Sequence, residues 1–272
     1  MKIIGFFIAV LTGFSAFGQH GIDIKAFNEK TETAVWLKAY DGIAWKTSDS
    51  VMTQDTSELK RLGAEWFCFQ DAENNWHAVY GKYDTGTFDQ VFHYLVNDSF
   101  QVARSYEQVD TSILLGYSRA LITANEQIRP VRDSIPIRFN QFIRQEPDGG
   151  YTVWIFPAFQ PDATAIYGGE FIYSIDRNGT TVLEDNSYFE GGFRGFKVGE
   201  PREIWLNYQH VSQPTLGAVF FAIYYDRYFS AINIETSAHV TRLINEDGQA
   251  FWVHVEKNDQ PSNKKKRRKK KK

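Results

Sequence analysis

The stretch Glu170–Leu183, with the sequence EFIYSIDRNGTTVL, gives the clearest indication of how this chain folds. Two runs rich in aromatic and β-branched residues, Glu170–Ile175 and Thr180–Leu183, flank the polar segment Asp176–Gly179. The Asn-Gly pair in that segment suits a two-residue turn in which both central residues have positive φ, which is the geometry of a tight hairpin. We therefore expect two antiparallel strands here.

The same combination of apolar runs and turn residues recurs through most of the chain. It predicts strands over 64–70, 76–81, 88–96, 100–104, 151–156, 202–209, 216–225, 228–235 and 250–256. For the pair at 88–104 a helix remains an alternative, because Thr87 and Gln90 have the spacing of a helix capping box. Connections this short cannot carry a parallel crossover, so the pairing should be antiparallel.

Helical periodicity is clearest over 111–128. Asp110 is a good N-cap, apolar residues then recur at alternating spacings of three and four, and Pro130 should end the helix. A shorter helix is expected over 32–41, ending before Gly42. The predicted fold class is therefore α+β and strand-rich, with one or more antiparallel sheets and about two helices in the N-terminal half.

The N-terminus has the pattern of a signal peptide. A positive residue near the start, Lys2, is followed by an apolar run over 3–14 and by two small residues, Ala16 and Gly18, before Gln19. A signal peptidase reads this order, which predicts cleavage before Gln19; a buried N-terminal segment is the alternative. The localisation expected from it is the periplasm or the space outside the cell.

The expected organisation has three parts: a signal peptide over 1–18, a single globular domain over 19–258 and a disordered polybasic tail over 259–272. Two smaller domains are an alternative for the middle part. No later apolar run approaches the roughly 20 residues that a membrane-spanning helix needs, so we expect no transmembrane segment in the mature chain.

Charge is distributed unevenly along the chain. The tail holds nine consecutive basic residues, Lys264, Lys265, Lys266, Arg267, Arg268, Lys269, Lys270, Lys271 and Lys272. Without these nine and Lys2, 20 of the 30 basic residues remain against 33 acidic ones, which leaves the rest of the chain strongly acidic. Like charges this dense repel one another and should keep the tail disordered. We expect the tail to associate with an anionic membrane surface or an anionic polymer, without specific nucleic-acid recognition; a solubilising extension or docking on the acidic domain are alternatives.

Three short motifs carry a resemblance to known proteins. They are Val153–Pro157, Gly168–Phe171 and Pro201–Ile204. With them the chain resembles uncharacterised exported proteins of Gram-negative bacteria. The resemblance implies export and no known activity, and a Gln at the first mature position is similar to the signal-peptide junctions of such bacteria.

Motifs for catalysis or metal binding are weak. Ser118 lies in a Gly-Tyr-Ser-Arg-Ala segment that lacks the second glycine of a nucleophile elbow and falls inside a predicted helix. Cys68 lies in a strand-like apolar run, which favours a packed core residue over an activated thiol. His254 and Glu256 alternate on one predicted strand and would need a third ligand; a hydrogen-bonded strand face explains them more simply. We therefore predict no metal and no cofactor.

Two regions remain as candidates for function. The glycine-rich segment at 188–196 is predicted to be a loop, and its candidate binding residues are Tyr188, Phe189, Phe193, Arg194 and Phe196. Such a loop would stack on a sugar ring or a partner chain, although long loops also pack aromatic residues on their own core. Acidic residues of the 170–190 region suggest a hydrolase of an envelope polymer as the alternative. Whether the protein is an enzyme stays uncertain, and the favoured interpretation is a non-catalytic envelope or secreted protein.

Overall fold

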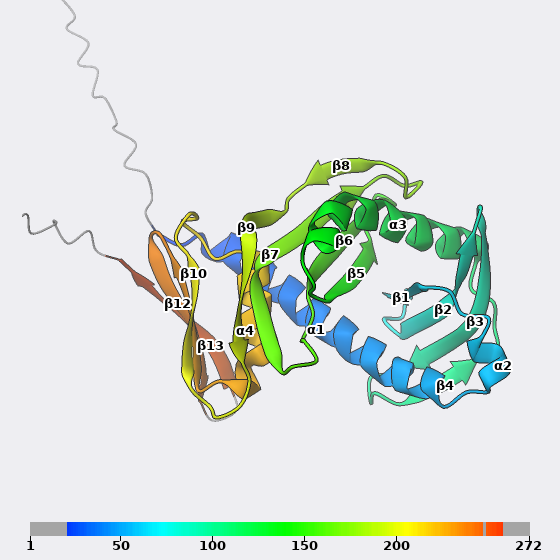
Figure 1. The fold of residues 1–272 in the computed structure, drawn as a ribbon, viewed down its shortest axis with the longest axis horizontal. Helices are drawn as coiled ribbons and strands as arrows, with labels where there is room; N and C mark the ends of the chain where they lie inside the picture. The colour runs from blue at the N-terminus through cyan, green and yellow to red at the C-terminus, as the bar shows by residue number, and fades with distance from the viewer. Residues whose placement is uncertain (1–20, 247–248, 258–272) are drawn as a thin grey trace, which may run out of the picture.

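The computed structural model describes residues 21–246 and 249–257 of the chain. The predicted signal peptide and the polybasic tail lie outside the described residues. The described part is α+β and consists mostly of strands (Figure 1). The helices are α1 (Ile24–Met52), α2 (Thr56–Leu59), α3 (Thr111–Ser134), α4 (Leu216–Tyr225) and the short 3-10 helix η1 (Asp226–Tyr228). The strands are β1 (Glu65–Gln70), β2 (Trp76–Asp84), β3 (Thr87–Val96), β4 (Val102–Ser105), β5 (Phe139–Gln145), β6 (Tyr151–Pro157), β7 (Thr164–Ile175), β8 (Val182–Asp185), β9 (Tyr188–Lys197), β10 (Glu203–Tyr208), β11 (Ala231–Thr236), β12 (His239–Glu246) and β13 (Gln249–Glu256).

The strands form three sheets. The first sheet is the antiparallel meander β1-β2-β3-β4, and the second has the order β5-β6-β7-β8 with β9 also paired to β7. The third has the order β10-β11-β12-β13. The hairpin predicted at the Asn-Gly pair is confirmed as β7 and β8. Its turn is not the expected two-residue type, because Gly179 has a φ of +74° but Asn178 does not have a positive φ. The segment 87–105 forms the hairpin β3–β4, not a helix.

Helix α1 connects the three sheets. It runs along the long axis of the molecule, from the third sheet to the first (Figure 1). Its buried residues recur every three or four positions, so that one face packs on the first two sheets while α4 packs beside it. At its N-terminal end Phe27 meets Trp252 of β13, edge to face, with ring centroids 5.1 Å apart. The buried apolar residues of all three sheets therefore form one continuous core.

Four predictions about these elements were wrong. The helix expected over 32–41 extends over 29 residues, with Asp23 as its N-cap and Gly42 in its interior. Helix α3 continues four residues beyond Pro130, because a proline removes one hydrogen bond but does not end a helix that is packed on its neighbours. The expected loop at 188–196 is strand β9.

The fourth error is the strand expected over 216–225, which is helix α4. The run LGAVFFAIYY is apolar throughout, so its periodicity cannot distinguish a buried strand from a buried helix. Thr215 caps it by accepting a hydrogen bond from the amide of Ala218. Because α4 provides a crossover, β10 and β11 pair in parallel, in contrast to the expected antiparallel pairing throughout. Helices are thus not confined to the N-terminal half.

Candidate functional site

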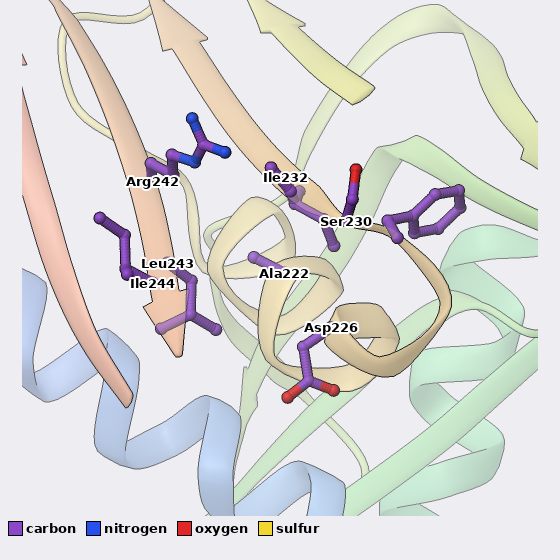
Figure 2. Close-up of a pocket in the computed structure, with 9 residues that line it drawn as sticks. Ala222, Asp226, Ser230, Ile232, Arg242, Leu243 and Ile244 are labelled. Atoms are coloured by element: carbon purple, nitrogen blue, oxygen red, sulfur yellow. The ribbon is translucent and has the colours of Figure 1, made fainter. Parts of the chain in front are cut away.

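Two pockets flank η1, and the first of them lies toward the third sheet. It has a volume of about 370 Å³, and Ile232 and Leu243 contribute apolar side chains to it. Figure 2 shows Arg242 and Asp226 at opposite ends of this pocket. Each is near an opposite charge already, since Arg242 lies 3.9 Å from Glu203 and Asp226 lies 3.8 Å from Lys38. The polar groups do not converge on one point, so this pocket is the weaker candidate.

The second pocket lies between α1 and α4, and we call it the aromatic cleft. Its volume is about 430 Å³. Aromatic side chains, three cations and one buried acid surround it: Lys38, Asp41, Gly42, Trp45, Lys46, Phe159, Tyr224, Tyr225, Arg227 and Tyr228. These residues come from α1, from the segment after β6 and from α4 with η1. An apolar pocket with a few fixed polar groups is the usual form of a ligand site.

The aromatic walls of the cleft are held in place and partly exposed. Phe159 and Tyr228 lie almost parallel, at an interplanar angle of 7° and a centroid distance of 6.1 Å. Trp45 is 62% exposed although it is a large aromatic residue. Exposed aromatic faces that gather around a hollow are suited to stack on a ring-shaped ligand.

Gly42 forms an open part of the cleft floor. A Cβ built at this position would meet no atom within 4 Å, so the space beside it is free. A glycine inside a helix costs about 1 kcal/mol relative to alanine. No close backbone approach and no positive φ explains this glycine. Other glycines of the described chain are equally open, but Gly42 is the one of them that lies within a helix.

Asp41 organises the polar side of the cleft. Its Oδ1 accepts a hydrogen bond of 2.9 Å from Asn140 of β5, and its Oδ2 accepts one from the Tyr224 hydroxyl. Burial raises the pKa of Asp41, and hydrogen bonds from Tyr224 and Trp45 offset part of this rise. Both carboxylate oxygens accept a hydrogen bond from within the protein, so Asp41 fixes the position of the Tyr224 hydroxyl.

The cations around the cleft are incompletely neutralised. Lys38 donates to the carbonyl of Ile223 at 2.7 Å and lies near Asp226. Lys46 lies 4.8 Å from the centroid of the Phe100 ring, and Arg227 lies over the Tyr228 ring. Among the described residues, neither Lys46 nor Arg227 forms an ion pair with a carboxylate. The cleft thus combines aromatic surface with a net positive rim.

The five candidate residues of 188–196 lie on β9 and pack mainly on the protein's own aromatic side chains. Tyr188 packs on Tyr208, Phe189 on Phe171 and Phe193, Phe193 also on Phe139, and Phe196 on Tyr167. Arg194 donates to the carbonyl of Asn207 at 3.2 Å. Ligand binding by this segment stays a prediction. The nine basic tail residues lie outside the described residues.

The acids of the hydrolase alternative lie in different settings. Glu170 is buried and accepts a hydrogen bond from the amide of Gly217 in the first turn of α4. Glu190 on β9 accepts one from the Tyr188 hydroxyl, while Glu184 is exposed on β8. Burial raises the pKa of Glu170 to about 7, against the opposing effects of Thr215, Gly217 and Lys30. A catalytic pair of carboxyls in this region stays a prediction.

The weaker motifs have structural explanations. Cys68 is buried in β1, and burial raises the pKa of its thiol, which makes it a poor nucleophile. Ser118 is buried within α3. His254 shares a 3.0 Å hydrogen bond with Thr241 and packs on Phe27. Within the described ranges, no group of three potential ligands is placed to hold a metal ion.

A chain of hydrogen bonds at the first sheet involves two histidines. His77 lies 2.9 Å from His93 between ring nitrogens, and its other nitrogen lies 3.2 Å from Asp71. His93 in turn contacts the carbonyl of Glu107 at 3.1 Å. The groups at the two ends, the Asp71 carboxylate and the Glu107 carbonyl, can only accept hydrogen bonds. All three hydrogen bonds therefore form together when the four ring nitrogens of the two histidines carry three protons between them. A fourth proton would place two N–H groups against each other.

The residues of the aromatic cleft were missed by the sequence analysis. The signal available in the sequence was that Asp41 and Trp45 are four residues apart, which places them side by side on a helix. The prediction that the helix ends before Gly42 removed this signal. Phe159 and Tyr228 are far from them in sequence, so only the fold brings these residues together.

Comparison with known protein families, curated proteins and solved structures finds no match to this chain. None of the helices that the structure describes is both long enough and apolar enough to span a membrane.

Proposed function

We propose that this protein is a non-catalytic binding protein that acts outside the cytoplasm, and that its aromatic cleft takes a ring-shaped ligand with an acidic group, such as an acidic sugar. The observation that carries the proposal is the open floor at Gly42, between aromatic walls and a positive rim. Export is supported by the signal-peptide pattern at the N-terminus.

The chemistry of the cleft favours this ligand class. A sugar ring has an apolar face for Trp45 or Tyr228 and hydroxyl groups around its edge for hydrogen bonding. Lys46 and Arg227, which lack carboxylate partners among the described residues, favour a ligand with a negative charge. The nine positive charges of the basic tail would add electrostatic attraction to a ligand that is an anionic polymer.

Calorimetric titration with a uronic acid and with its neutral parent sugar tests the proposal. We expect the uronic acid to bind more tightly, and added salt to weaken its binding. Gly42→Leu should lower affinity at least tenfold, because the new side chain fills the floor, while the helix is preserved or strengthened since leucine is a better helix former than glycine. Trp45→Ala should lower affinity by a similar factor.

Trp205→Ala is the matched control, because Trp205 is also an exposed tryptophan but lies on β10, outside the cleft. It should bind like the original protein. Equal affinity of the Gly42→Leu variant and the original protein would contradict the proposed site, and absence of binding to both sugars would contradict the ligand class.

The contribution of the tail is tested separately with vesicles that contain anionic lipid. The full chain should sediment with them at low salt, and a chain that ends at residue 263 should not. Equal sedimentation of the two would show that the tail does not provide this attraction.

A further inference from the structure

A second aromatic hollow lies on the other flank of α1, and we call it the tryptophan groove. Its volume is about 440 Å³, and Trp36 and Trp76 form its aromatic surface. The two rings lie 5.6 Å apart at an interplanar angle of 36°. Trp36 donates its indole N–H to Gln70 at 3.0 Å, and Arg144 lies over its ring. These contacts fix the orientation of Trp36, so the groove is preformed.

One row of residues on α1 joins the two hollows. Trp36, Ala39, Gly42 and Trp45 follow one another at intervals of three residues, so they form an oblique line across the helix surface. Ala39 lines the tryptophan groove and Gly42 lines the aromatic cleft. Between the two tryptophans no side chain of this row is larger than a methyl group. Along this row, the surface of α1 between the two hollows therefore carries no large side chain.

The separation of the two tryptophans exceeds one sugar ring. Nine residues of α-helix rise about 13 Å, and the turn of 100° per residue places Trp36 and Trp45 on opposite flanks. A ligand that touches both must be a chain that passes over Ala39 and Gly42. We propose that the aromatic cleft and the tryptophan groove form one continuous binding track for a linear carbohydrate several rings long.

This inference rests on the proposed function and adds the length and direction of the ligand to it. Charge distinguishes the two ends of the track. Lys38, Lys46 and Arg227 lie at the aromatic cleft, whereas Glu32 is exposed at the tryptophan groove, where the charge of Arg144 is paired with Glu146. The acidic group that the track recognises therefore lies at the cleft end.

The test is calorimetric titration of the full chain with oligomers that carry one uronic acid at one end and an increasing number of neutral sugar rings, from the uronic acid monomer upward. We expect affinity to rise at least tenfold from the monomer to the longer oligomers and then to level off, because further rings extend beyond the track. Trp36→Ala should remove this gain and leave affinity for the monomer unchanged, whereas Trp45→Ala should weaken every length.

Two further variants separate binding from folding. Ala39→Leu places a larger side chain between the two hollows without removing an aromatic residue. This variant should also lose the rise in affinity with oligomer length. Trp205→Ala should bind all lengths like the original protein. Monomer binding without any gain in longer oligomers would overturn the track and leave the proposed function standing; no binding at any length would overturn both. Equally tight binding of poly-glutamate, unaffected by Trp36→Ala, would overturn the carbohydrate class.

Discussion

Glu170→Gln should change how the stability of this protein depends on pH. The carboxyl is buried against the first turn of α4, and burial raises its pKa from the ordinary 4.5 to about 7. The folded state therefore holds this proton more tightly than the unfolded state. Its contribution to stability is complete below pH 4.5 and is lost as the pH rises through 7.

The magnitude follows from the size of the shift. One pKa unit corresponds to about 1.4 kcal/mol, so a rise from 4.5 to about 7 corresponds to about 3 kcal/mol of unfolding free energy lost between acid and mildly alkaline pH. Glutamine has the shape of the protonated acid and keeps an oxygen for the Gly217 amide. The variant should therefore not lose this part of its stability at alkaline pH.

Urea unfolding of both proteins at pH 5 and pH 8 measures the effect. The original protein should lose about 2.5 kcal/mol more than the variant between the two conditions, because the unfolded carboxyl is already mostly ionised at pH 5. Other groups that titrate in this range cancel in the comparison, since both proteins contain them. Glu184→Gln, which changes an exposed acid on β8, serves as a control and should leave the pH dependence as it is. The same pH dependence in the Glu170→Gln variant and the original protein would refute the reasoning.

Three further substitutions have clear expectations. Burial lowers the pKa of His93, so the stability that this neutral ring provides is lost as the pH falls below 6.5, and His93→Gln should flatten that loss in urea midpoints measured between pH 7 and 5. Tyr40→Phe should cost about 1–3 kcal/mol in urea unfolding at pH 7, because the buried amide of Cys68 loses the hydroxyl that it contacts at 2.8 Å; an unchanged midpoint would show that water replaces it. Gly116→Ala should lower the melting temperature, at a cost of about 1–3 kcal/mol, because its Cβ would lie 2.0 Å from the Tyr151 hydroxyl; full retention of stability would mean that Tyr151 moves freely.

Local chemistry was sufficient to predict several elements of the fold. The hairpin at Asp176–Gly179 and the cap at Asp110 depend on neighbouring residues alone, and the structure confirms both. Helix α4 could not be predicted in this way, because its ten residues are almost uniformly apolar and its conformation is set by what surrounds it. Gly42 is a similar case, since α1 is held by the sheets on one side and α4 on the other, and these contacts offset the low helix propensity of glycine.

The candidate site was less accessible from sequence than the fold. Trp45, Phe159 and Tyr228 are separated by long stretches of chain, and no spacing rule relates them. In contrast, Trp36, Ala39, Gly42 and Trp45 lie within one helix, and their common spacing of three was visible once the helix was known to continue beyond Gly42.

The position of α1 also has a consequence for the order of folding. Its first turns meet Pro214 through Lys30 and Trp252 through Phe27, residues that are synthesised 184 and 225 positions later, respectively. Contacts between such distant parts of a chain form slowly, because a long loop must close before they can stabilise anything. Part of the apolar face of the N-terminal part of α1 therefore has no packing partner until the last strands have been synthesised. A nascent chain cannot complete this fold, and we expect it to depend on protection from aggregation until its C-terminal strands are present.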